Sequence, residues 1–313
     1  MATILITHGI PTAGLEALND HDIIMPQPLA AYSMDELLAL IPKADAVIAG
    51  GKLPGNVIRA GTRLKIIANY GAGYDSVDIR AAADCGVPVT NIPDTVTDAT
   101  AELAIGLMLS VSRRIGEMNL RLRREETATL FGMGRYMGNT LRGQTLGIIG
   151  CGRIGKRVSE MAKALGMRVI AYSRSPVSPD VGENTELPSL LERADVVSLH
   201  CPLTNETRNL MNAAAFARMK RGAILINTAR GGVVDHDALA EALRSGRLAG
   251  AGLDVYPEEP CIPEAILAMD RVVCTPHVGA NTAQTRAAMA KACAKQILDA
   301  FNDKRPMNIV NGL

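Results

Sequence analysis

Residues 145–155 read Thr-Leu-Gly-Ile-Ile-Gly-Cys-Gly-Arg-Ile-Gly, an apolar run that ends in the pattern Gly150-x-Gly152-x-x-Gly155. Each glycine of this pattern has a physical reason. The first permits a tight turn off a strand, the second lets a pyrophosphate approach bare backbone, and the third lets the next helix pack closely on the sheet. The free N–H groups and the positive dipole end of that helix then favour bound phosphate.

The residues around the pattern provide the context that it needs. Residues 146–149 read as a buried strand, and residues 153–165 read as an amphipathic helix that Gly166 ends. The stretch therefore predicts a dinucleotide site, with contacts from the backbone and side chains of Gly150, Gly152, Arg153, Ile154 and Gly155.

Strand-like and helix-like segments alternate along nearly the whole chain, which is typical of parallel α/β architecture. Strands are predicted in the first half at 2–7, 22–25, 46–49, 64–69 and 87–90. Strands are predicted in the second half at 146–149, 168–172, 196–200, 223–227, 250–255 and 272–275.

The glycine pattern begins late, at residue 150, so the regular segments before it form a domain of their own. We predict an α/β protein of two doubly wound parallel-sheet domains. A Rossmann dinucleotide-binding domain at 98–282 is inserted in a flavodoxin-like substrate domain made of 1–97 and 283–313. A long helix over 282–302 leads the chain back, so that its C-terminus completes the first domain.

Residues 98–124 are predicted to form an unusually long helical stretch between the two halves. Its first part, 101–111, is apolar nearly all round, which indicates a helix that is buried on several sides. Two interpretations stay open: an interdomain hinge that packs on a partner subunit, or a core helix.

Charge and cysteine usage exclude several classes of protein. A net charge of +1 gives no electrostatic footprint for nucleic acid or for an anionic membrane. The N-terminus lacks a basic signal-peptide region, and the apolar run 103–111 is too short to span a bilayer, so we expect a cytoplasmic protein. The six cysteines lie apart and predict reduced thiols, with no disulfide frame and no metal site.

A basic run also lies in the predicted long helix, where acidic residues interrupt it. We interpret it as the solvated face of the helix; its members are Arg113, Arg114, Arg121, Arg123 and Arg124, interleaved with Glu117, Glu125 and Glu126.

Polar or glycine-rich residues follow each predicted strand of the second half. Because ligands of open α/β sheets bind at the carboxyl ends of the strands, one cleft is expected to gather these groups. They are the glycine loop 150–155, Ser173-Arg174-Ser175, His200-Cys201-Pro202, Thr228-Ala229-Arg230-Gly231-Gly232, Asp254 and Thr275-Pro276-His277.

Two of these residues, together with one further acidic residue, suit hydride reduction of a carbonyl next to a carboxylate. Arg230 offers a planar cation that binds a carboxylate and polarises the carbonyl. His277 suits the proton donor, because an imidazole changes its charge near neutral pH. A carboxylate on the far ring nitrogen would favour the protonated imidazole, and Glu259 is our candidate.

The chain resembles the D-isomer-specific 2-hydroxyacid dehydrogenases, a family that includes glyoxylate/hydroxypyruvate reductases and phosphoglycerate dehydrogenases. The resemblance runs through nearly the whole chain, with motifs in the family's order and spacing. The matching segments are 69–75 (NYGAGYD), 93–102 (PDTVTDATAE), 147–155 (GIIGCGRIG), 199–204 (LHCPLT), 227–232 (NTARGG), 252–260 (GLDVYPEEP) and 275–279 (TPHVG).

The resemblance implies roles for individual residues. Arg230 would bind substrate, and Glu259 and His277 would form the acid/base pair, with His277 also contacting substrate and cofactor. The N–H groups of Ala72 and Gly73 would take the substrate carboxylate. Asp254 would hold the nicotinamide carboxamide. Further cofactor contacts are expected from Cys201, Pro202, Thr207, Thr228 and Gly279. The family is usually homodimeric.

The chain departs from the family pattern at two places. Many members have Trp before the glycine-loop strand; this chain has no Trp, and Phe131 is the candidate substitute. NAD-using members have an acidic residue after the second strand, where this chain has Ser173, followed by Arg174 and Ser175. This turn predicts a cofactor site that prefers NADP, with NAD also possible.

The sequence therefore predicts an NADPH-dependent enzyme that reduces a small 2-oxo acid, glyoxylate or hydroxypyruvate, to the D-2-hydroxy acid. Alternatives are an aryl-pyruvate reductase or an NAD-dependent member of the family. A nucleotide-sensing regulator on the same fold, like the C-terminal-binding protein corepressors, is the alternative from another class. Formate or phosphite oxidation is disfavoured, because the insertions of formate dehydrogenases are missing.

Overall fold

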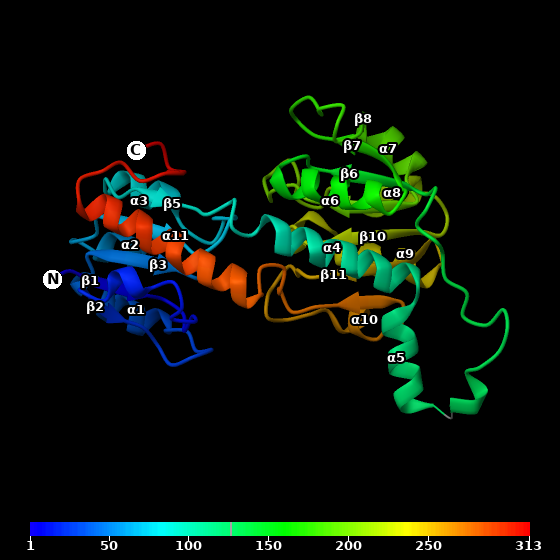
Figure 1. Ribbon diagram of the computed structural model, residues 1–313, viewed down its shortest axis with the longest axis horizontal. Helices are drawn as coiled ribbons and strands as arrows, with labels where there is room; N and C mark the ends of the chain where they lie inside the picture. The colour runs from blue at the N-terminus through cyan, green and yellow to red at the C-terminus, as the bar shows by residue number, and fades with distance from the viewer. Residues whose placement is uncertain (126) are drawn as a thin grey trace. The chain divides into compact units, whose positions relative to one another are not determined.

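The computed structural model describes residues 1–125 and 127–313, which divide into two compact units. Unit 1 contains residues 1–96 and 280–313, and unit 2 contains residues 97–279. Each unit is a parallel sheet with helices packed on it (Figure 1). The domain boundaries expected from the sequence were 97/98 and 282/283; the units of the structure divide at 96/97 and 279/280.

The sheet of unit 1 has the order β2-β1-β3-β4-β5, and all its strand pairs are parallel. The strands are β1 (Thr3–Ile6), β2 (Asp22–Ile24), β3 (Ala46–Ala49), β4 (Ile66–Asn69) and β5 (Val89–Thr90). The central strands β3 and β4 are buried along their whole length, as expected for a parallel sheet covered on both faces.

Helices cover both faces of the first sheet. The short helices α1 (Met34–Leu40), α2 (Gly55–Ala60) and α3 (Ile79–Asp84) cover one face, with Leu37, Val57 and Ala82 in its core. Helix α11 (Ala283–Phe301) and the 3-10 helix η1 (Glu16–Leu18) cover the other face, where Figure 1 shows α11 along the sheet. A second 3-10 helix, η2 (Ile41–Lys43), follows α1.

The C-terminal tail is hydrogen-bonded to the edge strand β5. The side chain of Asn311 accepts the Val89 N–H at 3.0 Å and donates to the Val87 carbonyl at 2.9 Å. Gln296 of α11 accepts the Thr90 hydroxyl at 2.8 Å in the buried interior. Residues from the two ends of the chain thus share one core.

The sheet of unit 2 has the order β12-β11-β10-β9-β6-β7-β8, again with parallel strand pairs throughout. The strands are β6 (Thr145–Ile149), β7 (Arg168–Tyr172), β8 (Glu183–Asn184), β9 (Val196–Leu199), β10 (Ala223–Asn227), β11 (Leu248–Leu253) and β12 (Val272–Cys274). Strand β8 was not predicted, because it consists of two exposed polar residues, which form no apolar pattern.

Two layers of helices enclose this second sheet. Helices α4 (Thr97–Ser112) and α6 (Arg153–Ala164) pack side by side on one face. Helices α7 (Leu187–Arg193), α8 (Ala213–Arg218) and α9 (His236–Arg244) pack on the other. The remaining helices are α5 (Ile115–Arg124), α10 (Glu264–Leu267), η3 (Thr127–Thr129) and η4 (Gly231–Val233). Among the described helices, none is long and apolar enough to cross a membrane.

The prediction of one continuous helical stretch over 98–124 is wrong, because the chain forms two helices there. Helix α4 ends at Ser112, and α5 begins at Ile115 after Arg114, whose φ is 56° in the left-handed region. The backbone N–H of Asn139 donates to the Ser112 carbonyl at 2.8 Å, so a later segment of the chain satisfies the end of α4. The left-handed Arg114 ends the helical path, and the bond from Asn139 satisfies a carbonyl that the helix leaves free.

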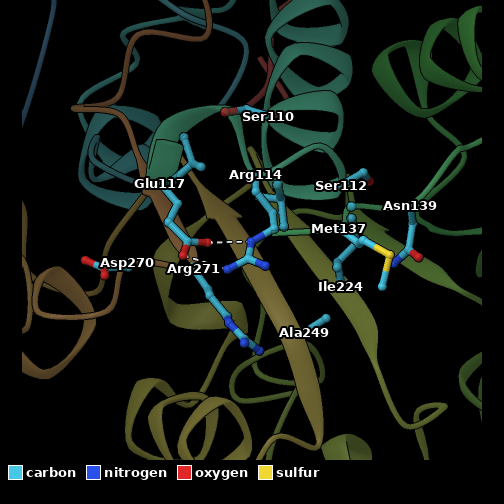
Figure 2. A pocket seen from close by; sticks show the side chains of 13 residues that line it. Ser110, Ser112, Arg114, Glu117, Met137, Asn139, Ile224, Ala249, Asp270 and Arg271 are labelled. Atoms are coloured by element: carbon cyan, nitrogen blue, oxygen red, sulfur yellow. Dashed lines mark hydrogen bonds and ion pairs between the residues drawn. The ribbon is translucent and has the colours of Figure 1, made fainter. Parts of the chain in front are cut away.

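The interpretation of the charged run as a solvated face is also wrong for Glu117. Its side chain is only 3% exposed and lies between two arginines, at 2.6 Å from Arg114 and 3.1 Å from Arg121. Figure 2 shows the Arg114–Glu117 pair in a pocket at the end of α4. Arg113, Arg123 and Arg124 are exposed as predicted. Glu126 lies outside the described residues.

Burial raises the pKa of Glu117, but its hydrogen bonds to Arg114 and Arg121 and their charges outweigh burial, so the pKa lies below its ordinary value. A carboxylate with this shift stabilises the fold above its unfolded-state pKa, and the contribution is lost as the pH falls through the folded-state pKa.

We therefore expect Glu117→Gln to lower the free energy of unfolding by about 1–3 kcal/mol at neutral pH, because two arginines lose their buried partner. The difference from the wild type should shrink in acid, measured by urea unfolding at several pH values. Glu125→Gln, at a carboxylate 39% exposed, is the control and should change little. An equal effect of both variants would contradict a special role for Glu117.

Candidate active site

The loops that follow the strands of unit 2 lie at one edge of its sheet. Because all the strands are parallel, their carboxyl ends share that edge. The structure thus brings together the predicted groups of unit 2: the glycine loop after β6, Ser173–Ser175 after β7, the loops after β9 and β10, Asp254 after β11 and His277 after β12.

The glycine loop has the close approaches that its pattern requires. Gly150 has a φ of 98°, and a Cβ there would lie 2.6 Å from the Cys201 nitrogen. A Cβ on Gly155 would lie 2.2 Å from the Gly150 carbonyl oxygen, so α6 can approach the strand only without a side chain. Around Gly152, no atom among the described residues would meet a Cβ within 4 Å.

The open side of this loop fits a pyrophosphate. Gly152 is the N-cap of α6 and offers no side chain that would satisfy the first N–H groups of the helix. These N–H groups and the helix dipole favour a bound phosphate. Arg153 is exposed at the first position of the helix, whereas Ile154 packs partly into the core.

Buried polar atoms near the ends of the next two strands support the same fit. His200 Nδ1 and Thr228 Oγ1 have no hydrogen-bond partner among the described residues. Burial lowers the pKa of His200 to about 4, so its ring is neutral, and its Nε2 lies 2.9 Å from Ser198 Oγ. Unpaired buried polar atoms are costly, so this edge suits a polar ligand that supplies partners.

The loop after β9 is held by its own hydrogen bonds. The hydroxyl of Thr207 donates to the Pro202 carbonyl at 2.6 Å and accepts the Thr204 N–H at 2.8 Å. Burial raises the pKa of the Cys201 thiol to about 11, so it stays protonated. The Thr207 side chain therefore shapes the loop, and its predicted cofactor contact stays a prediction.

His277 and Glu259 meet, as the sequence analysis required for an acid/base pair. His277 Nδ1 lies 2.7 Å from Glu259 Oε2, and the backbone N–H of Tyr256 donates to Glu259 Oε1 at 3.0 Å. Partial burial raises the pKa of Glu259, but the hydrogen bonds from His277 and Tyr256 and the charges of His277 and Arg230 bring it below its ordinary value. The carboxylate is therefore ionised at neutral pH.

Asp254 holds the segment that carries His277. Its carboxylate is 1% exposed and accepts the Thr275 hydroxyl at 2.6 Å, the Val278 N–H at 2.8 Å and the Gly279 N–H at 2.9 Å. The His277 N–H donates to the Asp254 carbonyl at 2.8 Å, and the φ of His277 is 52°. The fixed backbone directs the imidazole toward Glu259. A contact of Asp254 with a carboxamide stays a prediction.

Arg230 lies on a loop that packs tightly against the end of β11. Asn227 braces this loop, since its side chain donates to the Arg230 carbonyl at 3.0 Å and accepts the Ala229 N–H at 3.0 Å. A Cβ on Gly231 would lie 1.9 Å from the Tyr256 carbonyl carbon, so the two loops touch through backbone. The positive charge of Arg230 also lowers the pKa of the Glu259 carboxyl.

The loop with Ala72 and Gly73 belongs to unit 1. Asn69 donates to the Gly73 carbonyl at 2.9 Å, and Asn91 donates to the Ala72 carbonyl at 2.7 Å. Two buried asparagines thus hold the loop in a fixed form. Its role in binding a substrate carboxylate stays a prediction.

The sequence predicted no positioning role for three residues that support the predicted catalytic groups. They form hydrogen bonds to the loops of Arg230, Glu259 and Asp254, and they are Asn227, Tyr256 and Thr275. Tyr256 also donates its hydroxyl to the carbonyls of Leu253 and Thr275, at 3.1 and 3.0 Å. Their position beside the predicted residues, at the ends of strands, was the available signal. Phe131, the expected pocket aromatic, is 77% exposed.

A doubly wound sheet with an open glycine loop and an imidazole–carboxylate pair at the same edge defines a dinucleotide-dependent oxidoreductase. The family described as "D-isomer specific 2-hydroxyacid dehydrogenase, NAD binding domain" matches residues 105–279. A glyoxylate reductase of Thermococcus litoralis is 38% identical over 98% of this chain and 96% of its own length.

Two solved structures agree with this match. A protein from Thermus thermophilus has a TM-score of 0.92 at 39% identity and covers 98% of this chain and 99% of its own. An NADPH-dependent glyoxylate/hydroxypyruvate reductase from Sinorhizobium meliloti, in complex with NADP and malonate, has a TM-score of 0.86 at 31% identity, over 99% of this chain and 96% of its own. The chain belongs to the D-isomer specific 2-hydroxyacid dehydrogenase family and is an oxidoreductase.

The contact between the Arg230 loop and Tyr256 gives a test with a matched control. We expect Gly231→Ala to cost about 2–4 kcal/mol of stability and to displace Arg230, because its Cβ would overlap backbone. Gly232→Ala should be mild, since its nearest neighbour is the flexible Leu203 side chain at 3.1 Å. Thermal unfolding and the KM for a 2-oxo acid measure both effects, and equal behaviour of the two variants would refute the tight contact.

Proposed function

We propose that this protein reduces a small 2-oxo acid, of the glyoxylate or hydroxypyruvate type, to the D-2-hydroxy acid with NADPH. The observation that carries the proposal is the 2.7 Å contact between His277 and Glu259, at the same sheet edge as the glycine loop and Arg230. The names of the relatives, glyoxylate reductase and glyoxylate/hydroxypyruvate reductase, support the substrate class.

Each catalytic residue has a distinct role in the proposal. When bound, the nicotinamide supplies the hydride to the substrate carbonyl carbon. The Arg230 guanidinium binds the substrate carboxylate and polarises the carbonyl. His277 donates a proton to the carbonyl oxygen from Nε2, because Nδ1 is engaged with Glu259. The N–H groups of Ala72 and Gly73 add hydrogen bonds to the carboxylate.

The cofactor contacts in the proposal follow the open polar groups of unit 2. The backbone of Gly152 and the N-terminus of α6 hold the pyrophosphate. The unpaired Thr228 hydroxyl faces a ligand group. The adenosine end of the cofactor binds to Ser173, Arg174 and Ser175. The remaining contacts of the site come from Gly150, Arg153, Ile154, Gly155, Cys201, Pro202, Thr207, Asp254, His277 and Gly279.

We expect His277→Ala to lower kcat by roughly 10²–10⁴-fold, the usual effect of losing a positioned acid. Arg230→Ala should raise KM and lower kcat together, because the guanidinium binds substrate and stabilises developing charge. Arg244→Ala, at an exposed arginine paired with Glu241, is the matched control. Steady-state kinetics measure all three. Near-normal turnover of the His277 variant between about pH 5 and 9 would exclude the acid role.

The contact between Glu259 and His277 gives a second kinetic test. Glu259→Gln keeps an amide oxygen that can still contact His277 Nδ1 but removes the charge. We expect kcat to fall, but by less than in His277→Ala. A Glu259→Gln variant with the kcat of the wild type would exclude a role of this carboxylate in the reaction.

The preference for NADPH rests on the turn after β7. No acidic residue lies at 173–175, so no carboxylate there repels a 2′-phosphate, and Arg174 and Ser175 are exposed to bind it. The next acid, Asp180, accepts a hydrogen bond from the Ser178 hydroxyl. The relative from Sinorhizobium meliloti is described as NADPH-dependent, which supports the same preference.

A charge-assisted hydrogen bond contributes about 1.5–3 kcal/mol, so kcat/KM should favour NADPH over NADH by roughly 10–150-fold. Ser173→Asp combined with Arg174→Ala should shift the preference toward NADH. Parallel kinetics with both cofactors measure the ratio. A wild-type enzyme that favours NADH by about tenfold or more would overturn this assignment.

Two further parts of the proposal concern the substrate range and the assembly. A panel of 2-oxo acids, with both cofactors, separates glyoxylate and hydroxypyruvate from aryl pyruvates and from a regulator without turnover.

The expected homodimer draws support from exposed apolar side chains on α5 and in the segment after it, at Ile115, Leu122, Met133 and Met137. The molar mass in solution tests it.

A further inference from the structure

Two charged residues lie on either side of the glycine loop, in the loops that follow the two strands next to β6. The order β9-β6-β7 places the loop after β9 on one side of the glycine loop and the turn after β7 on the other. Arg174 lies in the turn after β7, and Glu206 lies in the loop after β9. Both are exposed at the edge where we place the dinucleotide.

The carboxylate of Glu206 is held in a fixed turn. The Thr204 hydroxyl donates to Glu206 Oε2 at 2.6 Å. Thr207 closes the same turn through its bonds to Pro202 and Thr204, and the Arg208 N–H donates to the Thr204 carbonyl at 3.0 Å. Although its side chain is exposed, Glu206 is therefore held by hydrogen bonds in the loop after β9.

The positive charge of Arg174 affects the pKa of groups in this turn. The Thr204 hydroxyl and the Glu206 backbone N–H lower the pKa of the Glu206 carboxyl, and the positive charge of Arg174 lowers it further. The same charge lowers the pKa of the Cys201 thiol, at the start of the loop after β9, although burial has the larger, opposite effect. Glu206 is thus an ionised carboxylate within the electrostatic reach of Arg174.

We propose that Glu206 is a specificity-determining residue, a fixed counter-charge to Arg174 that opposes the 2′-phosphate of NADPH and limits the preference for NADPH over NADH. A phosphate drawn to Arg174 also approaches the negative charge of Glu206, and this repulsion opposes its binding. NADH carries no such phosphate and meets no such repulsion. The inference rests on the proposed role of Arg174 in NADPH binding.

Calorimetric titration of the purified protein with NADPH and with NADH tests this directly. Glu206→Gln keeps a group that can accept the Thr204 hydroxyl but removes the charge. It should raise the ratio of NADPH to NADH affinity by about two- to fivefold at low salt, the range for exposed charge pairs. The gain should be smaller in the Arg174→Ala background, and in about 1 M salt it should vanish.

Glu192→Gln is the matched control, because Glu192 is also an exposed carboxylate, pairs with Arg218 and lies on α7, before β9 begins. It should leave both affinities unchanged. Kinetic ratios of kcat/KM for the two cofactors provide the second readout.

The outcomes separate the inference from the proposed function. If Arg174→Ala leaves NADPH affinity unchanged, the 2′-phosphate site itself is wrong. If Arg174→Ala weakens NADPH binding but Glu206→Gln leaves the NADPH/NADH ratio unchanged or lowers it, the role of Glu206 is overturned and the NADPH assignment stands.

Discussion

The buried carboxylate of Asp254 is the constraint on which the candidate active site depends. It joins the end of β11 to the segment after β12 through bonds to Thr275, Val278 and Gly279. A buried charge is tolerated only when it is well hydrogen-bonded, so the loop around it has little freedom. His277 lies inside this short loop, and its imidazole can meet Glu259 because the backbone on both sides is fixed.

The features predictable from the sequence were those with a local physical signature. Strands such as 46–49, 168–172 and 223–227 have the predicted bounds, because short apolar runs flanked by turn residues are typical of buried parallel strands. The pairing of His277 with Glu259 followed from motif order and strand ends, and the structure confirms their contact. Family membership is likewise confirmed.

The features that escaped prediction depend on residues far apart in the sequence. The break between α4 and α5 lies at the left-handed Arg114, and the Asn139 N–H from a later segment satisfies the Ser112 carbonyl at the end of α4. Glu117 looked like one of many surface charges, and only packing shows it buried between two arginines. Asn227 and Tyr256 hold the loops of the predicted catalytic residues through hydrogen bonds. The sequence could not indicate these bonds, because their partners come close only when neighbouring strands are placed side by side.

Unit 1 is built from two separate stretches of the chain, and this has a consequence for the order of synthesis. The ribosome releases β1 to β5 first, yet one face of that sheet is covered by α11, which follows all of unit 2 in the sequence. Unit 2 is complete in sequence when residue 279 emerges, so it can fold while the first sheet still exposes Ile4, Ile48 and Ile66. The nascent chain therefore carries an uncovered apolar surface until α11 emerges, and that interval is when it most needs protection from aggregation.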